Sequence, residues 1–410
     1  MQAYNTYVPG EAPATRILFA TLDLGEAMLA SGGEVHRVED TISRILRAYG
    51  AERVEVFTIT TSIIVTVQSK EWGTLTQTRR ISGQKFNLTR LCALNQLSRR
   101  VCKNPLPPDA FDAALAECAH TPSTSAALMP FAWALVSASF SIFFGGNLLD
   151  GLISAVVGII LCHAQTALNR IQLNSYISVI LLSILGGLLA RFPLQLGASV
   201  HPAAICIGNI MLLIPGISLT NSMRDLFSGD TIAGLLRFAE SIILSLAIGW
   251  GFALSAAGAN TASAPALPAL ISAFTGSVGF GYVFHFGGKN NFIGALGSTI
   301  AYGVVLLSVA LGLNEFLGYF LAAIMLGLWS EIFARVRQCP ATVFMVIGFI
   351  SLVPGGSLYR TMRYGLASDW SMFGLQGMHT GLYAIAISAG VVLITAITEV
   401  VYKNLKTKKA

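Results

Sequence analysis

IPGISLTNSMRDLFSGD, residues 214–230, returns 139 positions later as VPGGSLYRTMRYGLASD, residues 353–369. The two stretches align without a gap, and seven of their 17 positions are identical. Such dense identity over a short polar stretch indicates an internal duplication. The identical pairs are Pro215/Pro354, Gly216/Gly355, Ser218/Ser357, Leu219/Leu358, Met223/Met362, Arg224/Arg363 and Asp230/Asp369.

Long apolar segments surround both copies of the stretch. Of the 410 residues, 54% are hydrophobic and only 11% are charged, against roughly 25% charged residues in an average soluble protein. The first 122 residues contain 25 charged side chains, whereas the remaining 288 contain only 21. A segment so poor in charge cannot keep a soluble surface hydrated. We therefore predict a polytopic α-helical membrane protein with about ten spans, at 125–146, 148–168, 175–192, 200–217, 231–257, 266–286, 292–312, 314–335, 340–355 and 380–402.

The duplication divides these spans into two repeats of five helices, residues 123–258 and 259–410. An odd number of crossings forces the second repeat to lie upside down relative to the first. Inverted repeats recur in secondary transporters, whose substrate sites lie near the midplane where broken helices meet. Two further matches support the alignment, Phe144-Gly145-Gly146 with Phe286-Gly287-Gly288 and Pro202-Ala203 with Pro340-Ala341.

Positive charge in the connections predicts the orientation, because cytoplasmic loops are enriched in Lys and Arg. Ten spans with both termini in the cytoplasm place most of the cations inside, as expected for a multi-pass protein of the plasma (inner) membrane. The inward connections and the tail then carry Arg170, Arg224, Lys289, Arg335, Arg337, Lys403, Lys406, Lys408 and Lys409, and the outward connections carry Arg191, Arg360 and Arg363.

Residues 1–122 predict a small soluble α/β domain in the cytoplasm. Apolar residues at helical spacing, alternation typical of strands and a capping Asn87 define its elements. We expect helices over 13–31, 35–49, 88–101 and 109–119, and two strands around 54–56 and 63–65.

The duplicated Pro-Gly pairs mark the predicted substrate site. Proline and glycine cannot continue an ordinary helix there, and the freed backbone groups need partners inside the protein because lipid supplies none. Polar residues follow both breaks, so a cavity for a small zwitterion or anion is one interpretation; interfacial loops whose arginines contact lipid headgroups are the other. The predicted binding residues are Pro215, Gly216, Ser218, Asn221, Arg224 and Asp225 in the first copy, and Pro354, Gly355, Ser357 and Arg363 in the second.

Ionisable residues on the fifth helix of the first repeat indicate a place for proton coupling. Arg237 and Glu240 are three positions apart and share a helix face, and their equivalents in the second repeat are Gln376 and His379. A carboxylate and an imidazole at symmetry-related positions could carry protons, since burial raises the pKa of a carboxyl group toward neutral and an imidazole titrates near neutral. An inert, structural pair between Arg237 and Glu240 is the alternative.

Other kinds of chemistry find little support. No phosphate-binding loop, nucleophile elbow or zinc-protease motif occurs, the six cysteines form no CxxC pair, and no basic run is interleaved with aromatics. We therefore expect no enzyme activity, cofactor, metal or nucleic-acid partner; the expected partners are a small-molecule substrate, protons and lipid, and the sequence leaves association into a homo-oligomer open. The N-terminal domain also contains a charged cluster. It can be interpreted as a solvated helix start, a regulatory site or a hydrolytic site. Its members are Glu34, His36, Arg37, Glu39 and Asp40.

The stretch SGGEVHRVEDTISRILRAYGAERVEVF, residues 31–57, resembles the cytoplasmic domain of the threonine/serine exporter family. Residues 215–225 and GDTIAGLLRFAES, residues 229–241, are similar to its first membrane half, and the second half resembles its C-terminal module. The resemblance covers nearly the whole chain. It implies proton-driven export of threonine and serine, although a split-chain branch is associated with succinate export.

Three hypotheses about function remain at this point. The first is a proton-coupled antiporter that exports small hydroxy amino acids. The second is a dicarboxylate exporter using the same cavity. The third is a membrane-anchored enzyme or sensor that acts through residues 1–122.

We predict that Arg224→Lys and Arg363→Lys each impair transport, because arginine can hold a carboxylate through two parallel hydrogen bonds and lysine cannot. Losing one charged hydrogen bond, worth roughly 1.5–3 kcal/mol, should weaken substrate binding about ten- to a hundredfold. Arg335→Lys, in an ordinary inward connection, should be nearly silent. Uptake into vesicles measures all three variants, with membrane insertion as the control. Near-wild-type transport by both Arg224→Lys and Arg363→Lys would remove these arginines from the predicted substrate site.

Overall fold

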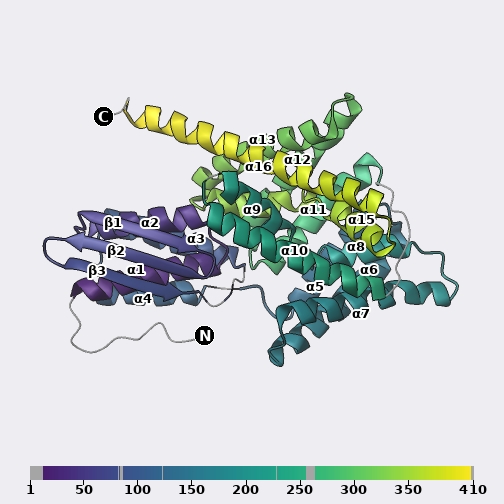
Figure 1. Cartoon of the computed structure of the whole chain (residues 1–410), viewed down its shortest axis with the longest axis horizontal. Coiled ribbons are helices and arrows are strands. Elements are labelled where there is room, and N and C mark those ends of the chain that lie inside the picture. Colours follow the sequence, from purple (N-terminus) through teal and green to yellow (C-terminus); the bar gives the residue numbers. More distant parts are fainter. Residues whose placement is uncertain are drawn as a thin grey trace.

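The computed structural model separates the chain into an N-terminal part, residues 13–121, and a membrane part, residues 123–407, which lie side by side (Figure 1). Within these limits the structure describes residues 13–81, 83, 86–121, 123–227, 229–254 and 264–407. The predicted boundary between the two repeats, at 258 and 259, and the tail residues Lys408 and Lys409 lie outside the described residues.

The N-terminal part packs four helices against a three-stranded antiparallel sheet of order β1-β2-β3. The middle strand alternates between buried and more exposed residues, and Ile63, Val65 and Val67 on its inner face are fully buried. The elements are α1 (Pro13–Ala30), α2 (Val35–Ala48), β1 (Arg53–Ile59), β2 (Ser62–Ser69), β3 (Gly73–Arg80), α3 (Leu88–Lys103) and α4 (Pro108–Ala119).

The sheet has a third strand, β3, whereas the sequence predicted only two strands. β3 pairs with β2 over its whole length, from Ser62 opposite Arg80 to Ser69 opposite Gly73. Its sequence GTLTQTRR contains a single apolar residue, Leu75, because β3 lies at the edge of the sheet. An apolar alternation therefore could not reveal it. The expected cap of α3 is present, as the Asn87 side chain accepts a hydrogen bond from the Arg90 amide.

The membrane part is a body of helices in which two similar series follow each other. Each series has three helices, then a pair of short helices, then a long helix. The first series is α5 (Met129–Phe143), α6 (Leu148–Arg170), α7 (Ser175–Gln195), α8 (Pro202–Ile210), α9 (Gly216–Phe227) and α10 (Thr231–Leu254). The second is α11 (Ala266–Val283), α12 (Gly288–Ala310), α13 (Glu315–Arg337), α14 (Ala341–Gly348) with a 3-10 turn (Phe349–Ser351), α15 (Gly355–Leu366) and α16 (Trp370–Thr407).

Both Pro-Gly pairs break a helix, as the sequence predicts. α9 begins at Gly216 and α15 at Gly355, one residue after the proline in each copy. The second pair of short helices, from Ala341 to Leu366, bends by 52°. The spans expected at 200–217 and 340–355 thus correspond to the first short helix of each pair, α8 and α14.

In the part of the chain that the structure describes, seven helices are long and apolar enough to cross a membrane, or eight if the bent pair counts as one span. α5 is a shorter apolar helix of 15 residues. The protein is therefore a polytopic membrane protein. The last helix begins at Trp370, ten residues earlier than expected, and the Asp369 carboxylate accepts a hydrogen bond from the Met372 amide there. The first turns of this helix are polar and include Gln376 and His379, so apolar character alone did not indicate its start.

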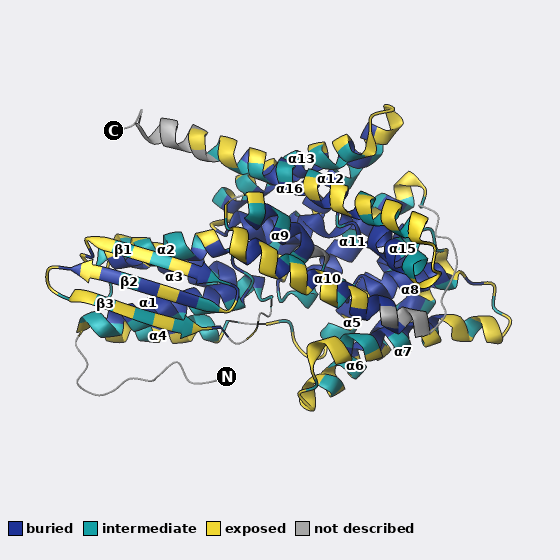
Figure 2. Cartoon of the chain, in the orientation of Figure 1, coloured by how far each residue is buried: buried dark blue, intermediate teal, exposed yellow. Residues whose placement is uncertain are grey.

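The two series pack against each other at their breaks. A side chain at Gly355 would meet the Met211 sulfur at 2.6 Å, and one at Gly249 would meet the Met362 sulfur at 3.0 Å. The Ser388 hydroxyl of α16 donates to the Thr220 carbonyl of α9 at 3.0 Å. Buried residues fill the middle of this body around α9 and α11, whereas α10 and α16 are exposed along their outer faces (Figure 2).

The N-terminal part docks on one end of the membrane part through the start of α3. The Leu88 amide donates to the Phe284 carbonyl at 3.1 Å, and the Phe86 ring lies 5.1 Å from the Phe284 ring. The Thr89 hydroxyl donates to the His285 carbonyl at 2.5 Å. The C-terminal end of α16 reaches the same end of the molecule, whereas α15 lies toward the opposite end (Figure 1).

Candidate functional site

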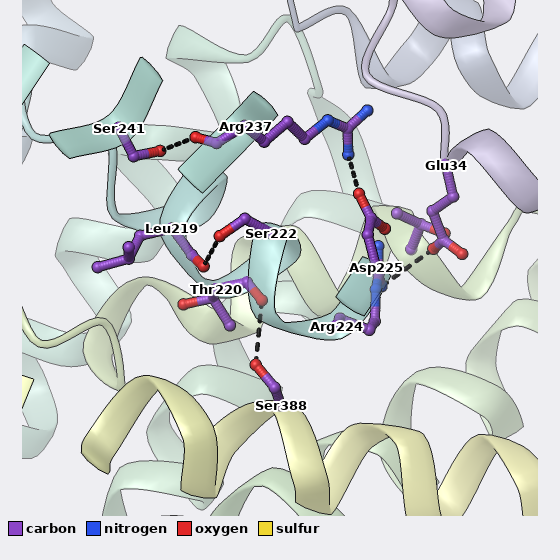
Figure 3. A network of polar contacts seen from close by, with 10 residues as sticks. Glu34, Leu219, Thr220, Ser222, Arg224, Asp225, Arg237, Ser241 and Ser388 are labelled. Atoms are coloured by element: carbon purple, nitrogen blue, oxygen red, sulfur yellow. Dashed lines mark hydrogen bonds and ion pairs between the residues drawn. The ribbon is translucent and has the colours of Figure 1, made fainter. Parts of the chain in front are cut away.

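A buried ionic cluster lies where the N-terminal part meets α9. The Arg224 guanidinium, at the end of α9, lies 3.1 Å from the Glu34 carboxylate (Figure 3). The Thr342 hydroxyl in the first turn of α14 donates to the same carboxylate. Arg224 is only 8% exposed. Three segments far apart in the sequence therefore converge on one carboxylate.

A second buried ion pair adjoins the first on the neighbouring residue of α9. The Arg237 Nη1 atom of α10 donates to the Asp225 Oδ2 atom at 2.9 Å, and both residues are buried (Figure 3). Removing one partner of such a pair leaves an uncompensated charge and is strongly unfavourable. The pair therefore fastens α9 to α10, across the turn that joins them.

Hydroxyl groups around α9 complete its polar surroundings. The Ser222 hydroxyl donates to the Leu219 carbonyl, and the Ser241 hydroxyl donates to the Arg237 carbonyl. Among the predicted binding residues of this copy, Asn221 is buried, whereas Ser218 is partly exposed. The Pro215 carbonyl accepts the Leu219 amide at 2.9 Å, so the break still begins α9 with a regular hydrogen bond.

The second copy forms a different polar group around α15. The Ser357 hydroxyl donates to the Pro354 carbonyl at 3.0 Å and accepts a hydrogen bond from the Thr380 hydroxyl at 3.1 Å. The Arg360 Nε atom donates to the Gln376 side chain at 3.2 Å. Since Gln376 is equivalent to Arg237, each copy ties its short helix to its last helix through the same position.

The equivalent arginines of the two duplicated stretches lie in different surroundings. Arg224 is bound in the ionic cluster, whereas the Arg363 guanidinium lies over the Tyr364 ring, 4.8 Å from the ring centre, and is partly exposed. Tyr364 occupies the position of Asp225, so the second copy has no equivalent carboxylate. Both arginines lie in the last turn of their short helices, but they have different partners.

The predicted proton-coupling residues have different surroundings. Arg237 pairs with Asp225 and not with Glu240, which lies on an exposed face of α10. The His379 ring packs 5.6 Å from the Phe316 ring. The alternative of a structural pair between Arg237 and Glu240 is not what the structure has, because the long Arg237 side chain reaches Asp225 instead.

Within the charged cluster of the N-terminal part, Glu34 forms an ion pair with the membrane part. The Glu39 carboxylate accepts the Thr58 amide at 2.8 Å, which ties α2 to β1. Burial raises the pKa of Glu39, against the lowering effect of this hydrogen bond. His36 is exposed, and Arg37 is near enough to Glu34 to lower its pKa.

Two contributors were missed by the sequence reasoning, Thr342 and Ser388. Thr342 follows the repeated Pro-Ala pair by one residue, but its equivalent in the first copy is Ala204. Ser388 lies among apolar residues of α16 and belongs to no motif. Neither residue carried a signal that could have been used.

Comparison with known proteins decides the family. Residues 20–258 match the family model for threonine/serine exporters, and residues 269–397 match a second model described as "Threonine/Serine exporter, ThrE". The chain belongs to the threonine/serine exporter family. This confirms the resemblance noted in its sequence.

Individual relatives agree with the family. A Mycobacterium tuberculosis protein named "Probable threonine/serine exporter" is 24% identical over 400 residues, which cover 92% of this chain and 75% of that protein. A Corynebacterium glutamicum protein named "Threonine/serine exporter" is 22% identical over 405 residues, covering 90% and 80%. A Klebsiella aerogenes protein named "Probable succinate transporter subunit YjjP" is 33% identical over only 76 residues, covering 18% and 28%. No solved structure matches the chain.

We predict that Arg237→Gln destabilises this exporter-family protein by about 3–5 kcal/mol, because it leaves the Asp225 carboxylate buried and unpaired. The double variant Asp225→Asn/Arg237→Gln should recover most of that loss, since two neutral amides replace the ion pair. Thermal unfolding of the purified protein in detergent measures both. Arg335→Gln, which breaks a partly exposed pair with Glu331, is the control and should cost about 0.5 kcal/mol or less. A double variant as unstable as the single one would contradict the pairing.

Proposed function

We propose that this protein is a secondary active exporter that carries threonine and serine out of the cell. The observation that carries the proposal is the buried Arg224 guanidinium, which binds a carboxylate at the end of the short helix that follows the first Pro-Gly break. Amino acids present the same chemical group, and arginine binds carboxylates with defined geometry. Membership of a family named for threonine and serine export supports this substrate class.

The proposal includes ten spans arranged as two inverted repeats behind a small α/β domain. The two series of helices have the same order, and each breaks its fourth element after a Pro-Gly pair. α5 and the α8–α9 pair would add two crossings to the eight candidates. The N-terminal part and the end of α16 lie at the same end of the molecule, which an even number of crossings requires (Figure 1).

This arrangement also gives the proposed orientation and boundaries. The domain would comprise residues 1–122 and the repeats residues 123–258 and 259–410. Both termini would lie in the cytoplasm, and the protein would lie in the plasma membrane. Cations of the even-numbered connections support that orientation.

We also propose that protons drive export. Arginine stays protonated at physiological pH, so Arg237 would not itself carry the coupling proton. Its part would be to hold the Asp225 carboxylate, whose protonation would release the guanidinium. Glu240 and His379, at symmetry-related positions, remain proposed proton carriers.

Two alternatives have weaker support. A dicarboxylate would also bind an arginine, but the similarity to the relative named for succinate covers only 18% of this chain. An enzyme or sensor acting through residues 1–122 would leave the membrane part without a role. The transporter family of the whole chain favours a protein that is no enzyme.

We predict that inverted membrane vesicles containing this protein accumulate labelled threonine and serine but not succinate. An acid interior should stimulate accumulation at least severalfold, because protons leaving the vesicle would drive substrate entry. An uncoupler should abolish the stimulation, and vesicles without the protein are the control. Succinate accumulation would favour the dicarboxylate alternative, uptake without any effect of the gradient would contradict proton coupling, and no uptake at all would contradict export.

A further inference from the structure

We propose that Arg224 and Thr342 form the subsite for the carboxylate of the transported amino acid, and that Glu34 of the N-terminal part occupies this subsite as a tethered stand-in. The inference rests on the proposed function and deepens it. It adds one ligand, Thr342, and it makes Glu34 a gate at the inner end of the site. A substrate would enter only by taking the place of the Glu34 carboxylate.

The subsite has the donors that a carboxylate requires. The Arg224 Nη1 atom lies 3.1 Å from the Glu34 Oε1 atom, and the Thr342 hydroxyl donates to that same oxygen. The donors come from α9 and α14, one short helix from each series. A ligand held there therefore contacts both halves of the membrane part, as a substrate must if the halves are to move around it.

Arg224 has a donor to spare. Its Nη2 atom is buried and has no hydrogen-bond partner among the described residues. A buried donor without an acceptor is costly, so a group that accepts from both terminal nitrogens would bind better than the present contact. A free carboxylate can form such a bidentate pair with arginine, whereas Glu34 contacts Arg224 through one nitrogen.

Glu34 is placed to act as a gate rather than as a helix cap. It occupies the N-cap position of α2, yet its side chain makes no capping hydrogen bond. Shorter side chains such as aspartate are the usual caps at that position. The Glu34 side chain extends away from α2 to Arg224 (Figure 3), so its ion pair is with the membrane part.

Protons alone should not open this gate. Burial acts to raise the pKa of Glu34, but the guanidiniums of Arg224, Arg37 and Arg237 and the hydrogen bond from Thr342 lower the pKa to about 2. A lowered pKa means that the contact contributes fully above the ordinary value of 4.5 and is lost only as the pH falls toward 2. Between about pH 5 and 8 the carboxylate stays ionised, and displacement by substrate is what opens the site.

The test is threonine uptake into inverted vesicles containing the full-length Glu34→Gln variant. Removing the competing charge should lower the threonine concentration for half-maximal uptake about tenfold. Thermal unfolding checks that the variant folds, and Glu55→Gln, on the exposed β1 strand, is the matched control and should leave uptake unchanged. A raised half-saturation concentration in a folded variant would make Glu34 a direct ligand of the substrate and overturn the gate. An unchanged one would show that Glu34 does not occupy the subsite.

A second variant tests the subsite itself. In the Glu34→Gln background, Thr342→Val should raise the half-saturation concentration about fivefold, because the substrate carboxylate loses the hydroxyl donor. No change would remove Thr342 from the subsite. Failure of the proposed function is distinguishable, since wild-type vesicles would then accumulate neither threonine nor serine.

Discussion

The membrane part depends on one constraint: a helix that breaks inside an apolar layer must find partners for its freed polar groups within the protein. Both series break after a Pro-Gly pair, and each break is covered by the other series. Gly355 lies against Met211 just before the first break, and α16 donates a hydroxyl to the Thr220 carbonyl. The second half thus supplies a hydrogen bond to the first half, and the first half packs an apolar side chain against the second break.

The same constraint explains why the N-terminal part docks where it does. A guanidinium as buried as that of Arg224 needs an acceptor, and its partner on α9, Asp225, is already held by Arg237. Glu34 supplies the acceptor from outside the membrane part. The N-terminal part therefore completes the buried ionic cluster, and the gate that we propose is the exchange of this contact for a ligand carrying the same group.

Local sequence patterns predicted many of the helices and strands, but they could not predict contacts between residues far apart in the sequence. The breaks at Pro215 and Pro354 follow from residues that cannot continue a helix, and the Asn87 cap follows from its side chain. The pairing of Glu34 with Arg224 joins residues that no pattern connects. A spacing of three put Glu240 beside Arg237, but it could not show that Arg237 reaches another helix.

The inverted arrangement of the two halves is the claim on which the proposed site depends most, and labelling of matched loops tests it directly. Ile171, after α6, and Leu313, before α13, are exposed residues of corresponding connections. Each would be changed to cysteine in a chain whose six native cysteines are replaced by serine, and an impermeant maleimide applied to sealed vesicles of either orientation. Inverted halves predict that Ile171→Cys reacts only from the cytoplasmic face and Leu313→Cys only from the opposite face. Reaction of both from the same face would contradict the inversion.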